Sequence, residues 1–266
     1  ILVDFIKFIL KRNPYLPKYI YLDKYESFGL ATQASKQKEV YLNDSYDYKI
    51  AESTCELLSK NHSPIKSYYF ERDGFLLNLV IAIFYSKYDL NIVDFGGGSK
   101  PQFPKISNTI SNYASYTIVD RDKLIEKINS YKKDKDITFN KNISIISYSN
   151  FMISKIHIDV CFFGSSIQYL DKSYETVEKI IKRGCKIFII SDSIFTNFEQ
   201  DFYVLQVNIK NTTFPHKFHS KAKFINFMKF HGFELKSNWI VPQRSTHNYL
   251  KNNEFSNQSF VFIKNS

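Results

Sequence analysis

The stretch Asn91-Ile92-Val93-Asp94-Phe95-Gly96-Gly97-Gly98-Ser99-Lys100 sets three consecutive glycines behind a short apolar run that ends in a carboxylate. The whole chain has only eight glycines, so the cluster at 96–98 is unusual within it. Glycine has no Cβ, and backbone built from it lets a ligand approach closely. The apolar residues that follow, Phe103, Ile106 and Ile110, recur at helical spacing. A strand, a glycine turn and a helix in this order are typical of a nucleotide-binding crossover, although an ordinary tight turn has the same local pattern.

A second acidic residue stands where such a crossover binds its nucleoside. Residues 115–119 form an apolar run that predicts the next strand, and the run ends in Asp120, 26 residues after Asp94. A carboxylate at the end of the second strand, about 20 residues or more beyond the glycine turn, is placed to accept hydrogen bonds from both ribose hydroxyls. Arg121 opens the helix that follows, and we include it with Asp120 in the predicted cofactor site.

The alternation of strands and helices continues down the chain. Residues 143–146, 158–163 and 186–190 are apolar runs that predict three further strands, and this rhythm indicates a parallel sheet. Open α/β sheets hold their ligands at the carboxyl ends of the strands. The polar residues that follow these strands are therefore predicted to line the site: Ser149, Asn150, Ser165, Ser166, Gln168 and Asp192.

The last third of the chain departs from this rhythm. Residues 195–211 contain no clear crossover helix, whereas Ser220 can cap an amphipathic helix that Gly232 ends. Residues 233–241 and 259–263 are β-prone and predict an antiparallel pair at the edge of the sheet. The predicted fold is therefore α/β, a Rossmann-like and mostly parallel seven-stranded sheet with a C-terminal antiparallel hairpin. This is the architecture of class I methyltransferases rather than of dinucleotide dehydrogenases.

The residues before the sheet have a different character. We divide the chain into an N-terminal helical extension, residues 1–66, and a main domain, residues 67–266. Residues 1–12 carry apolar side chains on one helical face, so this helix either docks on the main domain or lies on a membrane surface. Residues 46–60 predict a second helix within an otherwise polar and irregular segment.

The composition excludes several classes of protein. The net charge of +10 suits an anionic ligand, but the lysines are scattered and no basic block interleaved with aromatics predicts a nucleic-acid surface. Cys55, Cys161 and Cys185 lack metal-binding spacing, so we predict no metal and a reduced, cytoplasmic protein. The longest apolar run, residues 75–85, is about half the length that a bilayer requires, which predicts no transmembrane helix. The sequence begins at Ile1, so a preceding leader stays an open question, as does the oligomeric state.

Taken together, these motifs make the chain resemble class I S-adenosylmethionine-dependent methyltransferases. More narrowly, it resembles a family of methyltransferases found in polysaccharide and lipopolysaccharide biosynthesis regions. Besides the general glycine motif, the matching pieces are Tyr69-Phe70-Glu71-Arg72-Asp73, Gly164-Ser165-Ser166-Ile167-Gln168-Tyr169-Leu170 and Ile190-Ser191-Asp192. Several positions depart from the pattern. Lys100 stands where the third glycine of the usual turn belongs, Ser193 stands where an arginine is expected, and His216 and His219 lie in a segment that is usually more aromatic.

The resemblance implies S-adenosylmethionine as cofactor, S-adenosylhomocysteine as product, and a role for each part of the site. The glycine turn with Asp94 would approach the methionine portion, and Arg72 would bind its carboxylate unless it only caps its helix. Asp120 would bind the ribose, with Ser149 and Asn150 near the adenine. Ser165, Ser166 and Gln168 would line the gap between the cofactor and the acceptor. The implied acceptor is a sugar hydroxyl or a phosphate-linked group on a surface-polysaccharide precursor.

A hydroxyl acceptor is helped by a general base, for which the sequence offers three candidates. His216 and His219 lie beyond the fifth predicted strand, on the ligand side of the sheet, and Asp192 is their rival. A lone histidine more often has a structural role than a catalytic one, so a structural role is the alternative for each of these two. The segment after the fifth strand, residues 195–220, is predicted to form the acceptor side of the pocket, with Lys210 and Lys217 as candidates to meet a phosphate.

Two other functions stay open at this point. One is an NAD-dependent or nucleotide-sugar oxidoreductase, against which the missing third glycine and the terminal hairpin argue. The other is a binding module that keeps the fold without turnover. The retained glycines, Asp94 and Asp120 predict cofactor binding but do not predict turnover.

Overall fold

The structure, a computed structural model, describes residues 19–35, 44–59, 90–98, 101–103, 115–207, 213–240, 245–247, 250 and 254–265. Some features expected from the sequence lie outside these ranges. They are the helix over residues 1–12, Arg72 with its neighbours, the apolar run 75–85, the position of Lys100, and most of the helix after the glycine turn. These expectations stay predictions.

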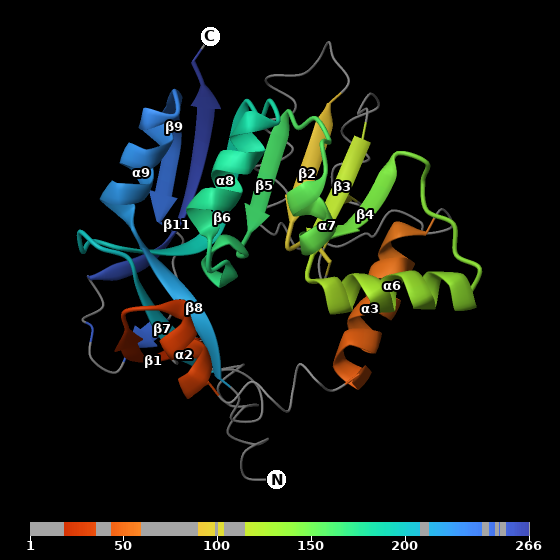
Figure 1. Cartoon of the computed structure of the whole chain (residues 1–266), viewed down its shortest axis with the longest axis horizontal. Helices are drawn as coiled ribbons and strands as arrows, with labels where there is room; N and C mark the ends of the chain where they lie inside the picture. The colour runs from red at the N-terminus through yellow and green to blue at the C-terminus, as the bar shows by residue number, and fades with distance from the viewer. Residues whose placement is uncertain are drawn as a thin grey trace.

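Seven strands form the central sheet, in the order β9-β11-β6-β5-β2-β3-β4 within the described part of the chain. Their bounds are β2 Asn91–Phe95, β3 Ser115–Asp120, β4 Ile143–Ser147, β5 Val160–Gly164, β6 Ile187–Thr196, β9 Phe233–Ile240 and β11 Phe255–Lys264. Strands β4, β3, β2, β5 and β6 are parallel, and β11 runs antiparallel to both β6 and β9. The predicted mostly parallel seven-stranded sheet with a C-terminal antiparallel pair is confirmed, with β9 at its edge (Figure 1).

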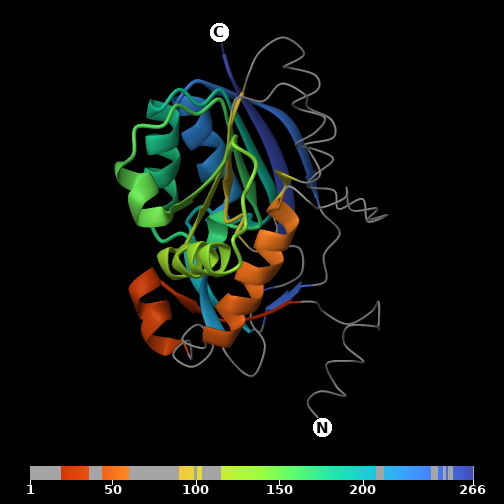
Figure 2. The same cartoon turned by 90° about the vertical axis from the view of Figure 1, so that its right-hand side faces the viewer.

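The inner strands are continuous apolar runs because both faces of the sheet are covered. On one face, strand residues such as Ile92 and Ile189 pack against helices α3 (Asp44–Leu58) and α6 (Asp122–Asp134). On the other face, residues such as Phe163 and Phe188 pack against α7 (Tyr148–Ile153), α8 (Ser173–Lys182) and α9 (Lys221–Phe230). The side view separates α3 from α7 and α8 across the sheet (Figure 2). A separate hydrophobic core therefore lies on each face of the sheet. The helix predicted over residues 46–60 corresponds to α3.

A second group of strands extends the sheet and was not predicted. It consists of β1 (Tyr19–Tyr25), β7 (Phe202–Val207), β8 (Thr213–Ser220) and β10 (Ser245–His247), with α2 (Phe28–Ala34) beside them (Figure 1). Strand β7 pairs antiparallel with both β1 and β8, while β10 pairs parallel with β1. Strand β8 joins this group to the central sheet through the end of β6. The described residues therefore hold an 11-stranded sheet, in which the seven predicted strands form the central part.

The expectation that the segment before the sheet is irregular apart from one helix was wrong for β1 and α2. Likewise, residues 195–207, the described part of the segment 195–211, contain no helix, as predicted, but they contain β7. Strand β1 pairs with β7 from the far half of the chain, so its formation depends on a partner that local sequence pattern does not reveal.

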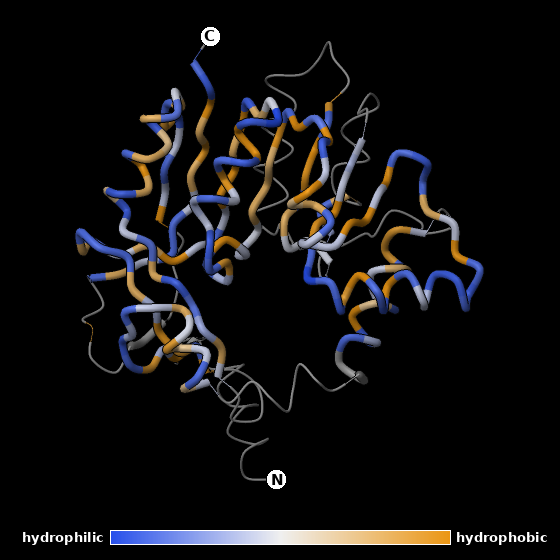
Figure 3. Tube along the Cα trace, in the orientation of Figure 1, coloured by the Kyte–Doolittle hydropathy of each residue, from blue (hydrophilic) through white to orange (hydrophobic). Residues whose placement is uncertain are grey.

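The helix ends follow local capping chemistry. Ser220 caps α9, because its hydroxyl accepts a hydrogen bond from the Lys223 amide at 3.3 Å. Gly232 follows that helix with a φ of 83°, the left-handed conformation that glycine adopts without strain. Figure 3 shows the apolar residues along the inner strands and the polar ones on the outer helices and turns. In the residues that the structure describes, no helix is both long and apolar enough to span a bilayer.

The two candidate histidines on β8 are buried and neutral, which makes the stability of the fold depend on pH. Burial lowers the pKa of His216 to about 3 and that of His219 well below its ordinary value. Below pH of about 6.5 the unfolded chain protonates both histidines while the folded chain does not, so stability falls as pH decreases. Each group contributes a slope of up to about 1.4 kcal/mol per pH unit in that range.

We expect His216→Gln and His219→Gln each to flatten the fall in unfolding free energy between pH 6.5 and 5, measured by urea titration. His157→Gln is the matched control, because that imidazole is largely exposed and lies outside the core. Identical pH slopes in the wild type and both variants would contradict the neutral, buried assignment.

Candidate functional site

The carboxyl ends of the five parallel strands bring the predicted residues to one edge of the sheet. The glycine turn follows β2, Asp120 ends β3, and the parallel registers align Phe95 with Val119 and Asp120 with Ser147. Residues 164–168 follow β5, where Gly164 is aligned with Ser191 of β6. All described residues that were predicted to line the site therefore lie at this edge, except for the two histidines. The histidines lie beside the edge, on β8.

The three glycines make room for their neighbours in the protein. The Gly96 amide donates to the Val119 carbonyl at 2.7 Å, and its φ of 82° is a conformation that other residues rarely adopt. A Cβ on Gly96 would lie 2.4 Å from the Ser166 Cβ. A Cβ on Gly97 would meet the Asp94 carboxylate at 2.4 Å, and one on Gly98 would meet the Asp120 carboxylate at 2.7 Å. Each glycine is therefore required by internal packing, apart from any approach to a ligand.

Asp94 lies beneath the glycine turn, with 1% of its surface exposed. Its Oδ2 accepts a hydrogen bond from the Gln102 amide at 3.0 Å and another from the Tyr116 hydroxyl. Burial and the nearby Asp94 carboxylate raise the pKa of Tyr116 well above its ordinary value, so the phenol stays a donor. Asp94 therefore stabilises the turn from inside.

Asp120 is held at the mouth of the turn by two backbone amides. Its Oδ2 accepts from the Gly98 amide at 2.9 Å, and its Oδ1 accepts from the Arg121 amide at 2.8 Å. Burial raises the pKa of Asp120, while these two amides act in the opposite direction. A carboxylate has about four acceptor positions, so the fixed group retains capacity for further donors.

The residues after β4 form a polar helix start. Ser147 caps α7, since its hydroxyl accepts from the Asn150 amide, and the side chains of Ser149 and Asn150 are exposed. The Ser149 hydroxyl donates to Asp122 Oδ1 at 2.7 Å. This hydrogen bond is the largest cause that lowers the pKa of Asp122. Sequence reasoning missed Asp122, whose place two residues after Asp120 was the available signal.

The segment after β5 has strained backbone. Ser165 and Asp192 have φ values of 53° and 46°, and the Ser165 hydroxyl donates to the Asp192 carbonyl at 3.0 Å. Positive φ in residues other than glycine is uncommon and clusters at functional sites. The Ser166 hydroxyl donates to the Phe95 carbonyl, which ties this segment to the glycine turn. Gln168 is buried, and its Oε1 has no donor in the described part of the chain.

Asp192 is held by β11. Its Oδ1 accepts from the Asn257 side-chain amide at 2.6 Å, and its backbone amide donates to the Ser259 hydroxyl at 3.0 Å. No sequence signal pointed to Asn257 or Ser259, because they lie 65 and 67 positions away from Asp192.

The two candidate histidines lie on opposite faces of β8, as expected three residues apart in a strand. His216 packs between Tyr21 and Tyr169, each with a ring-centroid distance of 5.1 Å. Tyr169 belongs to the short 3₁₀ turn η1 (Ile167–Tyr169) after β5, and its hydroxyl donates to Gln206 at 2.7 Å. The His219 imidazole lies within 3.0 Å of the Ser173 hydroxyl at the start of α8. Of the two histidines, His216 is the one that contacts the turn carrying Gln168.

Lys217 does not offer its charge to an outside group, contrary to the expectation that it meets a phosphate. Only 5% of its surface is exposed, and its Nζ lies 3.7 Å from the Asp201 carboxylate and 3.3 Å from the Ser173 hydroxyl. Tyr174 and Tyr203 lie against the same ammonium group. The other lysine named for that role, Lys210, lies outside the described residues.

Helix α3 from the N-terminal extension also contacts the site, which sequence reasoning missed. The Thr54 hydroxyl donates to the Gly98 carbonyl, and the Arg121 guanidinium pairs with Asp47. Arg121 was predicted to bind the cofactor, and the structure directs its Nη2 toward Asp47 of α3.

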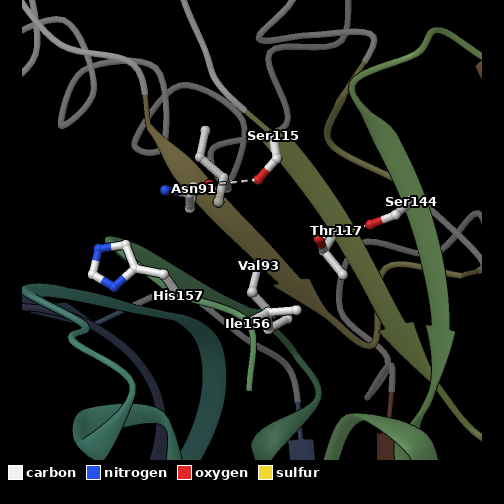
Figure 4. Close-up of a pocket in the computed structure, with 8 residues that line it drawn as sticks. Asn91, Val93, Ser115, Thr117, Ser144, Ile156 and His157 are labelled. Atoms are coloured by element: carbon white, nitrogen blue, oxygen red, sulfur yellow. Dashed lines mark hydrogen bonds between the residues drawn. The ribbon is translucent and has the colours of Figure 1, made fainter. Parts of the chain in front are cut away.

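A cavity of about 280 Å³ lies elsewhere, at the amino-terminal ends of β2 and β3. Asn91 and Ser115, the first residues of those strands, hydrogen-bond to each other at its rim, and Thr117, Ser144 and His157 also line it (Figure 4). It lies at the opposite end of the strands from the glycine turn. Because open α/β sheets bind their ligands at the carboxyl ends of the strands, we assign the candidate site to that edge and not to this cavity. Among the described residues, no group of three or more His, Cys, Asp or Glu side chains is placed to bind a metal.

Solved structures share this fold at low sequence identity. No family model matches the sequence, and neither does any curated protein. The [4+2]-cyclase SpnF aligns with a TM-score of 0.51 and 10% identity over 84% of this chain and 94% of its own. The N-terminal domain of EvdMO1, solved in the presence of SAH and D-fucose, aligns with a TM-score of 0.51 and 6% identity over 84% and 97%. Magnesium protoporphyrin IX methyltransferase from Synechocystis PCC 6803, with bound SAH, has a TM-score of 0.46, 8% identity and coverage of 73% and 83%. The two alignments with a TM-score above 0.5 show that the chain shares the Rossmann-like α/β fold of SpnF and the EvdMO1 domain.

Proposed function

We propose that this chain is an S-adenosylmethionine-dependent methyltransferase. The observation that carries the proposal is the glycine turn whose Gly98 amide and Asp120 carboxylate are joined at the carboxyl edge of a sheet with β11 inserted antiparallel between β6 and β9. A dinucleotide oxidoreductase remains the alternative, but this function does not account for the antiparallel strand β11 between β6 and β9. A domain of this fold has been solved in the presence of SAH, which supports the same cofactor class here.

The proposed cofactor lies along the edge from β4 to β5. Asp120 binds the ribose hydroxyls, because its position is fixed and it has spare acceptor capacity. The exposed side chains of Ser149 and Asn150 lie toward the adenine, and the turn at 96–98 faces the methionine portion. Arg72 is assigned to the methionine carboxylate by resemblance alone, since it lies outside the described residues.

Methyl transfer is an in-line displacement. The acceptor oxygen forms a bond to the methyl carbon as the carbon–sulfur bond breaks, and the bonding electrons remain on the sulfur. The proton of the acceptor hydroxyl leaves to a base or to water. The protein contributes mainly alignment and exclusion of water. Ser165, Ser166 and Gln168 border the gap in which the two reactants meet.

His216 is the best placed of the three base candidates. It contacts η1, whereas His219 faces α8 and the Asp192 carboxylate already accepts from Asn257. Burial keeps the His216 imidazole neutral, and the same burial makes it a weak base, with a pKa of about 3. Its proposed role is therefore to accept a hydrogen bond from the acceptor hydroxyl and orient it, with the proton passing on to water.

The strands β1, β7 and β8 form the proposed acceptor side. Tyr169 has 43% of its surface exposed beside them, and a flat aromatic ring suits the apolar face of a sugar. We assign the acceptor to the sugar hydroxyls of a surface-polysaccharide precursor, an assignment that rests on the family resemblance and on this aromatic surface. The EvdMO1 domain was solved in the presence of D-fucose, which is consistent with a sugar ligand on this fold.

Replacing Asp120 by Ala should weaken the binding of S-adenosylhomocysteine about five- to 150-fold, because the ribose loses hydrogen bonds worth about 1–3 kcal/mol. Calorimetric titration measures the change. Asp134→Ala is the matched control, since that carboxylate is exposed at the far end of α6. Wild-type protein that is stabilised by NAD but not by S-adenosylhomocysteine would favour the oxidoreductase alternative.

Replacing His216 by Gln should lower turnover about 100-fold, because the acceptor hydroxyl loses its alignment with the methyl group, while leaving affinity for S-adenosylhomocysteine near the wild-type value. The assay follows release of S-adenosylhomocysteine with a panel of sugar acceptors. His219→Gln should remain within a few-fold of wild type if it folds. An equal loss in His219→Gln alone would assign the role to that residue, and full activity in both variants would leave Asp192→Asn as the variant to test.

A further inference from the structure

Helix α3 makes two polar contacts with the predicted cofactor site. The Thr54 hydroxyl donates to the carbonyl of Gly98, the residue whose amide donates to Asp120. About two turns earlier along the helix, Asp47 pairs with Arg121, which is next to Asp120 in the chain. A segment assigned to the N-terminal extension thus reaches both the glycine turn and the ribose acid.

The Asp47 carboxylate is unusual for an outer helix such as α3, because its side chain is fully buried, with 0% exposed. Its Oδ1 accepts from the Arg121 guanidinium, and its Oδ2 has no donor among the described residues. The charge of Asp47 also raises the pKa of Asp120. A buried carboxylate with an unpaired oxygen is costly unless something else is gained from its position.

The need to stabilise the contact between α3 and α6 does not explain why this ion pair is present. Ala51, Cys55 and Leu58 of α3 pack in the core with residues of α6, and the Tyr131 hydroxyl of α6 donates to Glu52 at 3.1 Å. Buried ion pairs contribute little net stability compared with apolar packing. The pair instead fixes the orientation of the guanidinium, whose side chain remains 35% exposed beside Asp120.

We propose that Asp47 is a positioning residue for the nucleoside end of the cofactor site, acting through Arg121. This inference rests on the proposed function. A guanidinium plane stacks on aromatic faces, and a purine is such a face. Fixing the plane in advance removes the entropy that a free arginine side chain would lose on binding. Asp47 thus orders Arg121, and Arg121 with Asp120 binds the nucleoside from two sides.

The test is calorimetric titration of the full chain with S-adenosylhomocysteine and with adenosine, using Asp47→Asn, Arg121→Lys and the double variant. Each single variant should weaken both ligands by the same factor, about 2- to 100-fold. The double variant should be no weaker than the worse single variant, because the two residues act as one unit. Glu52→Gln, on the same helix and bonded to the same partner helix, should bind both ligands like the wild type.

The outcomes separate this inference from the proposed function. Folded wild-type protein that binds neither ligand would overturn the proposed function. Wild-type binding together with an unchanged dissociation constant in Asp47→Asn would overturn the inference alone. Additive losses in the double variant, or a loss for S-adenosylhomocysteine without a loss for adenosine, would overturn action through Arg121. If Asp47→Asn fails to fold, the Arg121→Lys variant decides the question. This variant keeps the charge pair with Asp47 but lacks the planar guanidinium group. Wild-type affinity of Arg121→Lys for both ligands would therefore overturn the proposal.

Discussion

The Asp94 carboxylate is buried beneath the glycine turn, and the arrangement of the cofactor edge depends on the donors that it finds there. A buried charge is tolerated only when hydrogen bonds replace its lost hydration. Here the Gln102 amide and the Tyr116 hydroxyl supply them, so the chain beyond the turn must fold back toward β2. The same carboxylate fills the space that a side chain at Gly97 would need. The turn, the strand before it and the neighbouring strand β3 are therefore fixed by one group.

The residues before the central sheet take part in both halves of the candidate site. Helix α3 contacts the glycine turn through Thr54, on the cofactor side. Strand β1 pairs with β7 and places Tyr21 against His216, on the proposed acceptor side. An extension that closes over one ligand alone would need only one of these contacts. The two together mean that this segment supports both the cofactor side and the proposed acceptor side of the candidate site.

Local pattern was sufficient to predict the parallel strands, the glycine turn and Asp120, because each depends on residues close together in the sequence. Strands β1 and β7 were missed, since they pair across most of the chain and their alternation is short. The partners of the site residues were missed for the same reason, as Asp47 shows for Arg121. Residue type also predicted an exposed charge on Lys217, whereas Asp201 and two tyrosine rings enclose it. Burial of polar side chains is a property of the assembled fold, and residue type predicts it poorly.

The fold by itself leaves the reaction open, because an aligned structure of this architecture is a [4+2]-cyclase. The cofactor edge is built on general features of such sheets, so the reaction has to be decided by what the chain adds at the acceptor side. Here that addition is β7 and β8, which hold His216 against η1 while Gln206 accepts a hydrogen bond from Tyr169. Two buried polar atoms beside this turn, Gln168 Oε1 and His216 Nδ1, have no hydrogen-bond partner among the described residues. Under the proposed function, an acceptor that reaches these atoms and brings hydrogen-bonding groups, as a polyhydroxylated one does, would be favoured over an apolar one. Specificity for a hydroxyl acceptor would then arise from the cost of leaving these atoms unpaired.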